Sequence, residues 1–188
     1  MKTSIGPRTI LYPTPVLIVG TYDAQGRPNI MNAAWGGICC SQPPCVAVSV
    51  RRQRHTHDAI LKRNGFTISL PSAAQVREAD YAGIYSGADE DKFAALGLTA
   101  KKSVLVDAPY VEEFPIVLEC RLLNSIELGT HTQFIGEILD VKIEEQVLED
   151  NRTPDIRKAD PIMFSPTDQS YYRVGDLVAK AFSVGRKP

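Results

Sequence analysis

Short apolar runs, each followed by a turn or a small helix, constrain the fold of this chain more than any other feature. None approaches the roughly 18 apolar residues that a membrane-spanning helix requires. The runs predict strands at residues 16–21, 29–32, 45–50, 66–70, 116–123 and 134–143. Because the strands do not alternate regularly with long helices, the pattern favours a mainly β fold, an antiparallel barrel, over a doubly wound parallel sheet.

The segments between these strands carry turn and helix signals. Asp23-Ala24-Gln25-Gly26-Arg27-Pro28 has the residues of a tight turn and predicts an antiparallel hairpin. A helix is predicted from Thr56, which we expect to cap it, to the stop at Asn64-Gly65. Two small helices are predicted near 73–81 and 91–96, the second ending at Gly97. Residues 144–160 indicate an exposed loop, and the apolar tail 171–185 is expected to pack back on the rest.

Length and charge narrow the possible functions. A chain of 188 residues predicts one domain, residues 1–188, with a core that needs no disulfide or metal. The net charge of −1 argues against a general nucleic-acid or anionic-membrane surface. The N-terminal residues have no apolar signal segment, so a cytoplasmic location is expected.

The four cysteines, Cys39, Cys40, Cys45 and Cys120, contain no C-x-x-C motif. We expect reduced thiols, two or more of them acting as small core hydrophobes. The adjacent pair Cys39-Cys40 is badly placed for an ordinary disulfide with itself, and a redox role for this pair is the alternative. His55 and His57 are two residues apart but have no third ligand at a suitable spacing, so no metal site is predicted.

Several catalytic and nucleotide-binding motifs are missing from the sequence. It has no G-x-G-x-x-G after a strand, no P-loop, no H-E-x-x-H and no G-x-S-x-G. A Rossmann dinucleotide site is therefore not supported, and no catalytic residue is predicted.

Residues 49–60 predict an anion site. A buried strand ends there and a helix begins, and free N–H groups at a helix N-terminus attract anions. Arg51, Arg52 and Arg54 crowd this point in a nearly neutral chain, and a guanidinium offers a planar fork of donors for phosphate oxygens. The alternative is that these arginines only solvate a loop. In residues 29–37, small side chains surround the single tryptophan, Trp35, and allow a flat ligand to approach the backbone.

The order and spacing of several motifs carry a family resemblance. In chain order they are Tyr12-Pro13-Thr14-Pro15-Val16, Asp23-Ala24-Gln25-Gly26-Arg27-Pro28-Asn29, Ala33-Ala34-Trp35, Pro43-Pro44, Arg54-His55-Thr56, Phe66-Thr67-Ile68-Ser69-Leu70-Pro71, Ser86-Gly87, Asp91-Lys92-Phe93, His131, Gly136-Glu137 and Ala181-Phe182-Ser183-Val184-Gly185. Over nearly its whole length the chain resembles the flavin reductase-like, FMN-binding split-barrel family, and more closely its flavoredoxin branch. Cys39-Cys40 departs from the pattern expected of that family.

The resemblance implies a six-stranded antiparallel split β-barrel with a few short peripheral helices. It further implies a homodimer that holds FMN at or near the subunit interface. Carried over motif by motif, it places Asn32, Ala33, Ala34 and Trp35 against the isoalloxazine and Ser49, Arg51, Arg54, His55 and Thr56 around the ribityl phosphate. The other cofactor-binding residues that it implies are Val50, Ser86, Gly87, Lys92 and His131.

The activity implied is that of an FMN-dependent oxidoreductase, since in this family the flavin carries the chemistry. It would accept hydride from NADH or NADPH and reduce free flavin or another acceptor. The alternative is a flavoredoxin-type carrier that receives electrons from a redox protein without fast NAD(P)H turnover. A third class is a split barrel that binds another ligand, such as heme, without turnover.

Overall fold

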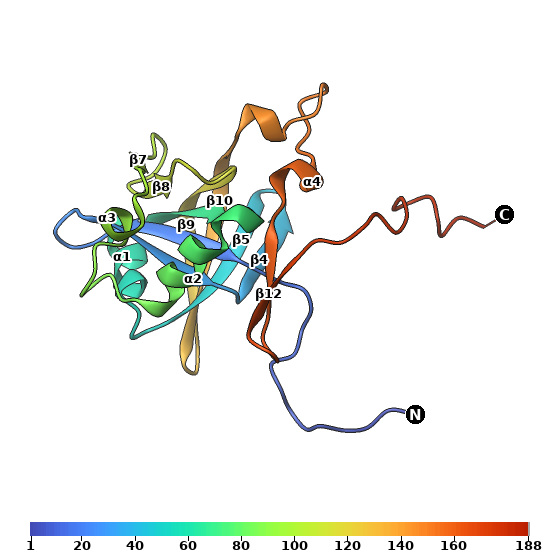
Figure 1. Cartoon of the computed structure of the whole chain (residues 1–188). Helices are drawn as coiled ribbons and strands as arrows, with labels where there is room; N and C mark the ends of the chain where they lie inside the picture. The colour runs from blue at the N-terminus through green and yellow to red at the C-terminus, as the bar shows by residue number, and fades with distance from the viewer. Residues whose placement is uncertain (188) are drawn as a thin grey trace.

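A seven-stranded sheet forms the body of the molecule (Figure 1). The computed structural model describes residues 1–187. In chain order the strands of this sheet are β2 (Leu17–Tyr22), β3 (Pro28–Ala33), β4 (Gly36–Ser41), β5 (Pro44–Arg51), β6 (Gly65–Leu70), β9 (Ile116–Leu128) and β10 (His131–Ile143). They lie in the order β3-β2-β6-β9-β10-β5-β4, and every neighbouring pair is antiparallel. The mainly β, antiparallel prediction is confirmed.

The number of strands differs from the prediction. All six predicted strands are present, as β2, β3, β5, β6, β9 and β10, but β4 is a seventh. Strand β4 was not predicted because Gly36-Gly37 and Cys39-Cys40 lack the β-branched residues typical of strands. Most of this strand is also exposed. Hydrogen bonding leaves β3 and β4 as the two edges, so within residues 1–187 the sheet is not a closed barrel.

Two smaller sheets flank this body. β1 (Thr14–Pro15), β11 (Ile162–Ser165) and β12 (Ser170–Arg173) form a three-stranded sheet in the order β1-β11-β12. β7 (Ala100–Lys102) pairs with β8 (Pro109–Val111). The three-stranded sheet brings residues near 164 and 171 next to the start of β2, which matters for the site described below.

The core follows the strand period. Along β5, Val46, Val48 and Val50 point into one buried cluster with Phe66 and Phe134, while the alternate residues face the opposite side of the sheet. A Cβ on Gly136 would lie 2.6 Å from Phe66 Cζ, so only glycine permits this packing. A second cluster forms around Ile18, Ile30 and Phe93 beneath the small helices.

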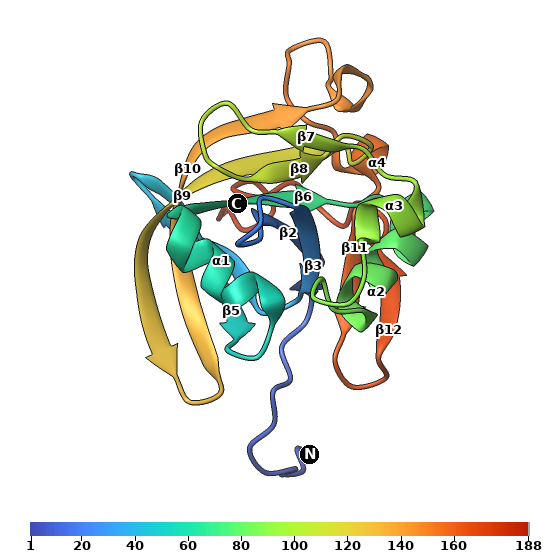
Figure 2. The ribbon, with the colours of Figure 1, turned by 90° about the vertical axis from the view of Figure 1, so that its left-hand side faces the viewer.

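Six helical segments cover the sheet: α1 (His55–Arg63), η1 (Ala73–Gln75), α2 (Val76–Ile84), α3 (Lys92–Leu96), η2 (Glu145–Val147) and α4 (Ile156–Ala159). Figure 2 shows the β2–β3 hairpin between α1 on one side and α2 and α3 on the other. The predicted stops at Asn64 and Gly97 are confirmed, since both residues adopt the left-handed conformation with φ of 53° and 65°.

The terminal segments correct another prediction. Residues 170–173 pair with β11, but residues 174–187 are exposed along their whole length and do not pack back on the sheet. In Figure 1 both terminal segments run away from the body on the same side. Among the described residues, no helix has the length and apolar character needed to cross a membrane.

Candidate functional site

Two adjoining cavities lie where β3, β5, α1 and the segment after α2 meet. The anion-side cavity, of about 210 Å³, is lined by Asn29, Met31, Gln53, Arg54, His55, Thr56, Tyr85, Ser86, Gly87 and Lys92. The tryptophan-side cavity, of about 150 Å³, is lined by Met31, Asn32, Ala33, Ala34, Trp35, Ser49, Val50, Arg51, Arg54, His131 and Phe164. Both include Met31 and Arg54, so the two cavities adjoin, with Arg54 at the junction.

The beginning of α1 forms one wall of the anion-side cavity. Arg54, and not Thr56, is the N-cap residue, and its side chain makes no capping bond. The prediction that Thr56 caps the helix is wrong, because Thr56 is the second helical residue and its hydroxyl accepts a 3.0 Å hydrogen bond from Asn29 Nδ2. The N–H groups of His55 and Thr56 have no acceptor within the helix, as for the first residues of any helix.

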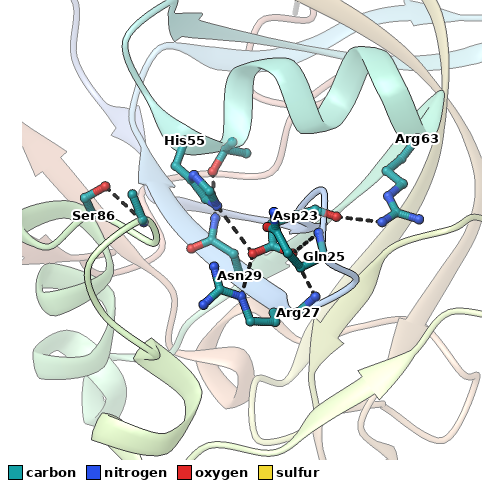
Figure 3. Close-up of polar contacts among 9 residues, drawn as sticks. Asp23, Gln25, Arg27, Asn29, His55, Arg63 and Ser86 are labelled. Carbon is teal, nitrogen blue, oxygen red and sulfur yellow. Dashed lines mark hydrogen bonds and ion pairs between the residues drawn. The ribbon is translucent and has the colours of Figure 1, made fainter.

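Asp23, in the turn between β2 and β3, accepts several hydrogen bonds next to this wall (Figure 3). Its Oδ1 accepts hydrogen bonds from the backbone N–H groups of Gln25 and Arg27, at 2.8 and 2.9 Å, and its Oδ2 accepts one from Arg27 Nε at 2.8 Å. Arg63, near the end of α1, donates to the Asp23 carbonyl oxygen at 2.6 Å. Burial raises the pKa of Asp23, but the hydrogen bonds from Arg27 and Gln25 outweigh burial and hold that pKa below its usual value. The carboxylate therefore ties the β2–β3 turn together, and Arg63 ties the turn to α1.

Two buried polar atoms of the anion-side cavity have no partner among residues 1–187. They are Asn29 Oδ1 and His55 Nε2, and the latter lies 3.8 Å from Asp23 Oδ2, beyond hydrogen-bond distance. Buried polar groups are nearly always paired, so atoms of this kind indicate a missing ligand or water. Gly87 closes the cavity opposite them. A Cβ at this position would lie 2.0 Å from Asn29 Oδ1 and 3.1 Å from His55 Cδ2.

Lys92 adds a buried cation to the same cavity. Its ammonium donates to the carbonyl oxygens of Ile30 and Ala82 at 2.7 and 2.9 Å, which leaves one donor free. Burial, followed by the positive charge of Arg54, lowers the pKa of Lys92 from 10.5 to about 8. An anion in the cavity would relieve this electrostatic cost.

At the other end of the site, Asn32 is held in one orientation. Its Nδ2 donates to the Ala79 carbonyl oxygen at 2.9 Å and to the Tyr171 hydroxyl at 3.3 Å, and Tyr171 donates to Asp80 Oδ1 at 2.9 Å. Burial and the Asp80 carboxylate raise the pKa of Tyr171, so this hydroxyl stays protonated. Ala33 and Ala34 follow, and their small side chains leave the cavity floor open.

A third cavity, the wide cavity of about 700 Å³, also has Trp35 in its wall. It also contacts Ala34 and Ser49, which line the tryptophan-side cavity, and extends to Gly36 and Ala47. The N-terminal segment supplies much of the remaining wall, with Arg8, Thr9, Ile10, Leu11, Pro13, Thr14 and Pro15. A planar ligand beside Trp35 would thus have open space next to it.

The structure brings all fourteen predicted binding residues to the two adjoining cavities. Ser49 and Arg51, which were expected at the phosphate, line the tryptophan-side cavity and not the anion-side cavity. Arg52 lies outside them, and its guanidinium pairs with Glu127 at 2.5 Å. Sequence reasoning did not assign five lining residues to the cofactor: Asn29, Met31, Gln53, Tyr85 and Phe164. Asn29 and Met31 lie inside the segment 29–37 that the sequence analysis singled out and could have been included with it, whereas Phe164 reaches the site only through the β1–β11 pairing.

A comparison with protein families matches residues 9–168 to the flavin reductase like domain. The chain belongs to the flavin reductase-like family. Within it, the flavoredoxin branch is supported by two solved structures. Flavoredoxin of Desulfovibrio vulgaris (Miyazaki F) is 59% identical, with a TM-score of 0.95 over 99% of this chain and 100% of that one. Flavoredoxin from Methanosarcina acetivorans is 31% identical, with a TM-score of 0.92 over 99% and 98%.

A protein of Archaeoglobus fulgidus, described as uncharacterized, is 34% identical over 131 residues, which is 70% of this chain and 73% of that protein. The flavoredoxin matches confirm the family resemblance of the sequence and its mainly β, split-barrel-like fold, with the seven-stranded sheet described above in place of six strands.

Proposed function

We propose that this chain holds FMN in the two adjoining cavities and passes electrons between a donor and an acceptor. The observation that carries the proposal is the difference in lining between the two adjoining cavities. One end has a cationic wall and unpartnered buried polar atoms, and the other end has small residues beside a tryptophan. FMN has the same division into a phosphate end and a flat aromatic end.

The residues present fit this group. At the phosphate end, Arg54, the first N–H groups of α1 and the free donor of Lys92 would hold the dianion. Phosphate and ribityl oxygens would supply partners for His55 Nε2, and a ribityl hydroxyl would donate to Asn29 Oδ1. At the other end, Asn32 to Trp35 would face the ring, with the Asn32 amide fixed by Ala79 and Tyr171.

FMN is proposed in preference to FAD because Arg54, Lys92 and the two unpartnered buried atoms gather at one cavity, which matches a single phosphate. FAD would need a cradle for a pyrophosphate, and the sequence carries no glycine-rich loop for one. Heat release of the bound cofactor followed by chromatography tests this. FMN at one molecule per chain is expected, and stoichiometric FAD would contradict the proposal.

For the electron donor we propose NADH or NADPH, with free flavin or another small molecule as acceptor. Bound FMN would supply the chemistry, accepting a hydride and releasing electrons singly or in pairs. The chain's own residues would bind, orient and shield. The wide cavity beside Trp35 supports this donor, because it offers a nicotinamide room to lie against the ring without a Rossmann site.

A flavoredoxin-type electron carrier is the second candidate function, and the 59% identity to a flavoredoxin favours it. Such a protein would receive electrons from another redox protein. Anaerobic mixing with NADH or NADPH in a stopped-flow spectrometer separates the two. Bleaching of the flavin absorbance within seconds supports the reductase, whereas a flavin that dithionite reduces but NAD(P)H does not supports the carrier. Absence of flavin in the purified protein would contradict both.

A further inference from the structure

Three of the four cysteines gather in the hairpin formed by β4 and β5. Cys40 and Cys45 are directly opposite in the register, and the next pair, Ser41 and Pro44, closes the hairpin. Opposite residues of an antiparallel pair have Cα atoms about 4.5–5.5 Å apart. This spacing lies inside the roughly 4.4–6.8 Å range of disulfide-linked residues. Cys39 falls at the bulge between Ile38 and Cys40 and has no register partner.

The sulfur atoms of Cys40 and Cys45 point to the same short loop. Cys40 Sγ donates to the Gln42 carbonyl oxygen and Cys45 Sγ to the Pro43 carbonyl oxygen, each at 3.4 Å. Opposite residues also share a face of the sheet, so neither thiol has to cross the hairpin to meet the other. Backbone pairing and side-chain direction therefore agree.

The two thiols differ in environment. Cys40 is exposed, whereas Cys45 is 3% exposed. Burial, followed by the neighbouring Cys40 and Cys39, raises the pKa of Cys45, so it stays a thiol while Cys40 meets solvent. Cys120 lies apart in the core, and burial raises its pKa to about 12. Among residues 1–187, no group of three or more His, Cys, Asp or Glu side chains is arranged to hold a metal ion.

We propose that Cys40 and Cys45 form a second redox site, a dithiol that a hydroperoxide oxidises to a reversible intrachain disulfide. The exposed Cys40 thiolate attacks the terminal peroxide oxygen, the O–O bond breaks, and water or an alcohol leaves as Cys40 becomes a sulfenic acid. The Cys45 sulfur then attacks the Cys40 sulfur, the S–O bond breaks, and the sulfenic acid oxygen leaves as water with the proton of the Cys45 thiol. The two thiols lose two electrons and two protons in total, and the hydroperoxide takes up both.

The site lies on the same sheet face as the wide cavity. Along β5, Cys45, Ala47 and Ser49 alternate with the core valines, and Ala47 and Ser49 line that cavity, as does Cys39. A small hydroperoxide that reaches this open cavity is therefore near the exposed thiols. The proposal goes beyond the flavin function and does not depend on it.

Thiol counting on the full chain tests the proposal. Reduced, desalted protein is treated with hydrogen peroxide, unfolded, alkylated and weighed by mass spectrometry. Two of the four wild-type thiols should be lost to alkylation without mixed dimers on a non-reducing gel, and dithiothreitol should restore both. Cys40→Ser should lose the bridge entirely. Cys39→Ser, the matched control at the adjacent exposed position, should still lose two of its three thiols.

Cys39 and Cys40 are exposed, so their serine variants should fold normally. The test therefore does not depend on whether a variant of the buried Cys45 folds. A bridge that persists in Cys40→Ser and vanishes in Cys39→Ser would overturn the pairing. A bridge found only between chains, or oxidation of Cys40 to sulfinic acid with no bridge, would overturn the intrachain site. Cys45→Ala adds a further check, since it should stop the reaction at the sulfenic acid, which dimedone traps.

Discussion

Arg54 and Arg52 are two residues apart in sequence, yet only Arg54 lies at the junction of the two cavities. Replacing Arg54 with alanine should weaken FMN binding by about 1–3 kcal/mol, the range for a lost hydrogen bond to a charged group. Riboflavin binding should change little, since riboflavin lacks the phosphate. Fluorescence titration with both ligands measures this. Arg52→Ala is the matched control, because Arg52 pairs with Glu127 on the surface. Equal weakening of both ligands by Arg54→Ala would mean that Arg54 supports the fold instead.

The buried Lys92 should make FMN affinity fall as pH rises, because its pKa is lowered. Its pKa of about 8 means that the side chain loses its charge in alkaline solution well before an exposed lysine. Because a phosphate favours the ammonium form, affinity should fall as pH rises from 7 to 9.5. By proton linkage the fall is at most about tenfold per pH unit above about 8. Riboflavin titrations at the same pH values are the control, and Lys92→Met should bind weakly with a flat profile. A steep profile retained in Lys92→Met would assign the titration to another group.

At the scale of elements, the segment between α2 and α3 places Gly87 against Asn29 in the wall of the anion-side cavity. A Cβ on Gly87 would lie 2.0 Å from Asn29 Oδ1, a fixed side chain that also donates to Thr56. Gly87→Ala must therefore displace either this segment or Asn29. We expect FMN affinity to drop at least about tenfold, which corresponds to about 1.4 kcal/mol, while the unfolding temperature changes little. Calorimetric titration and thermal unfolding measure the two effects. Gly175→Ala, where a Cβ meets no atom within 4 Å, is the control and should change neither.

Strands and helices whose own residues carry a clear pattern could be predicted from the sequence. Those that form only by pairing with another strand could not. Strand β5 follows from its alternating valines, and the end of α1 follows from Asn64, which adopts the left-handed conformation. Strand β4 could not be recognised, because glycines and cysteines form a strand there only by pairing with β5. The candidate site was predictable where a motif is contiguous, as in 32–35 and 54–56. Phe164 and Tyr171 reach the site through strand pairing across more than a hundred residues, which no local pattern encodes.

At the scale of the whole molecule, the exposed C-terminal segment 174–187 carries several apolar side chains. Leu177, Val178 and Phe182 are 78%, 98% and 94% exposed, although we expected the tail 171–185 to pack back on the rest of the molecule. Several exposed apolar side chains within one short segment are typical of an interaction surface. The N-terminal segment, whose Ile10 and Leu11 line the wide cavity, leaves the body on the same side in Figure 1. We propose that a second copy of the chain covers the tail, giving a homodimer in which both terminal segments lie near the proposed flavin site.

Burial of a leucine or phenylalanine contributes roughly 1.5–3 kcal/mol. The double variant Leu177→Ser and Phe182→Ser should therefore raise the dimer dissociation constant at least about a hundredfold. Light scattering over a range of concentrations should show a wild-type dimer and a variant that dissociates. Lys180→Ser, a polar change in the same segment, should remain dimeric. If the dimer completes the flavin site, the dissociated variant should also lose FMN, and restoring high protein concentration should recover it. A wild-type monomer with full flavin occupancy would show instead that one chain suffices, and the tail would then need another partner.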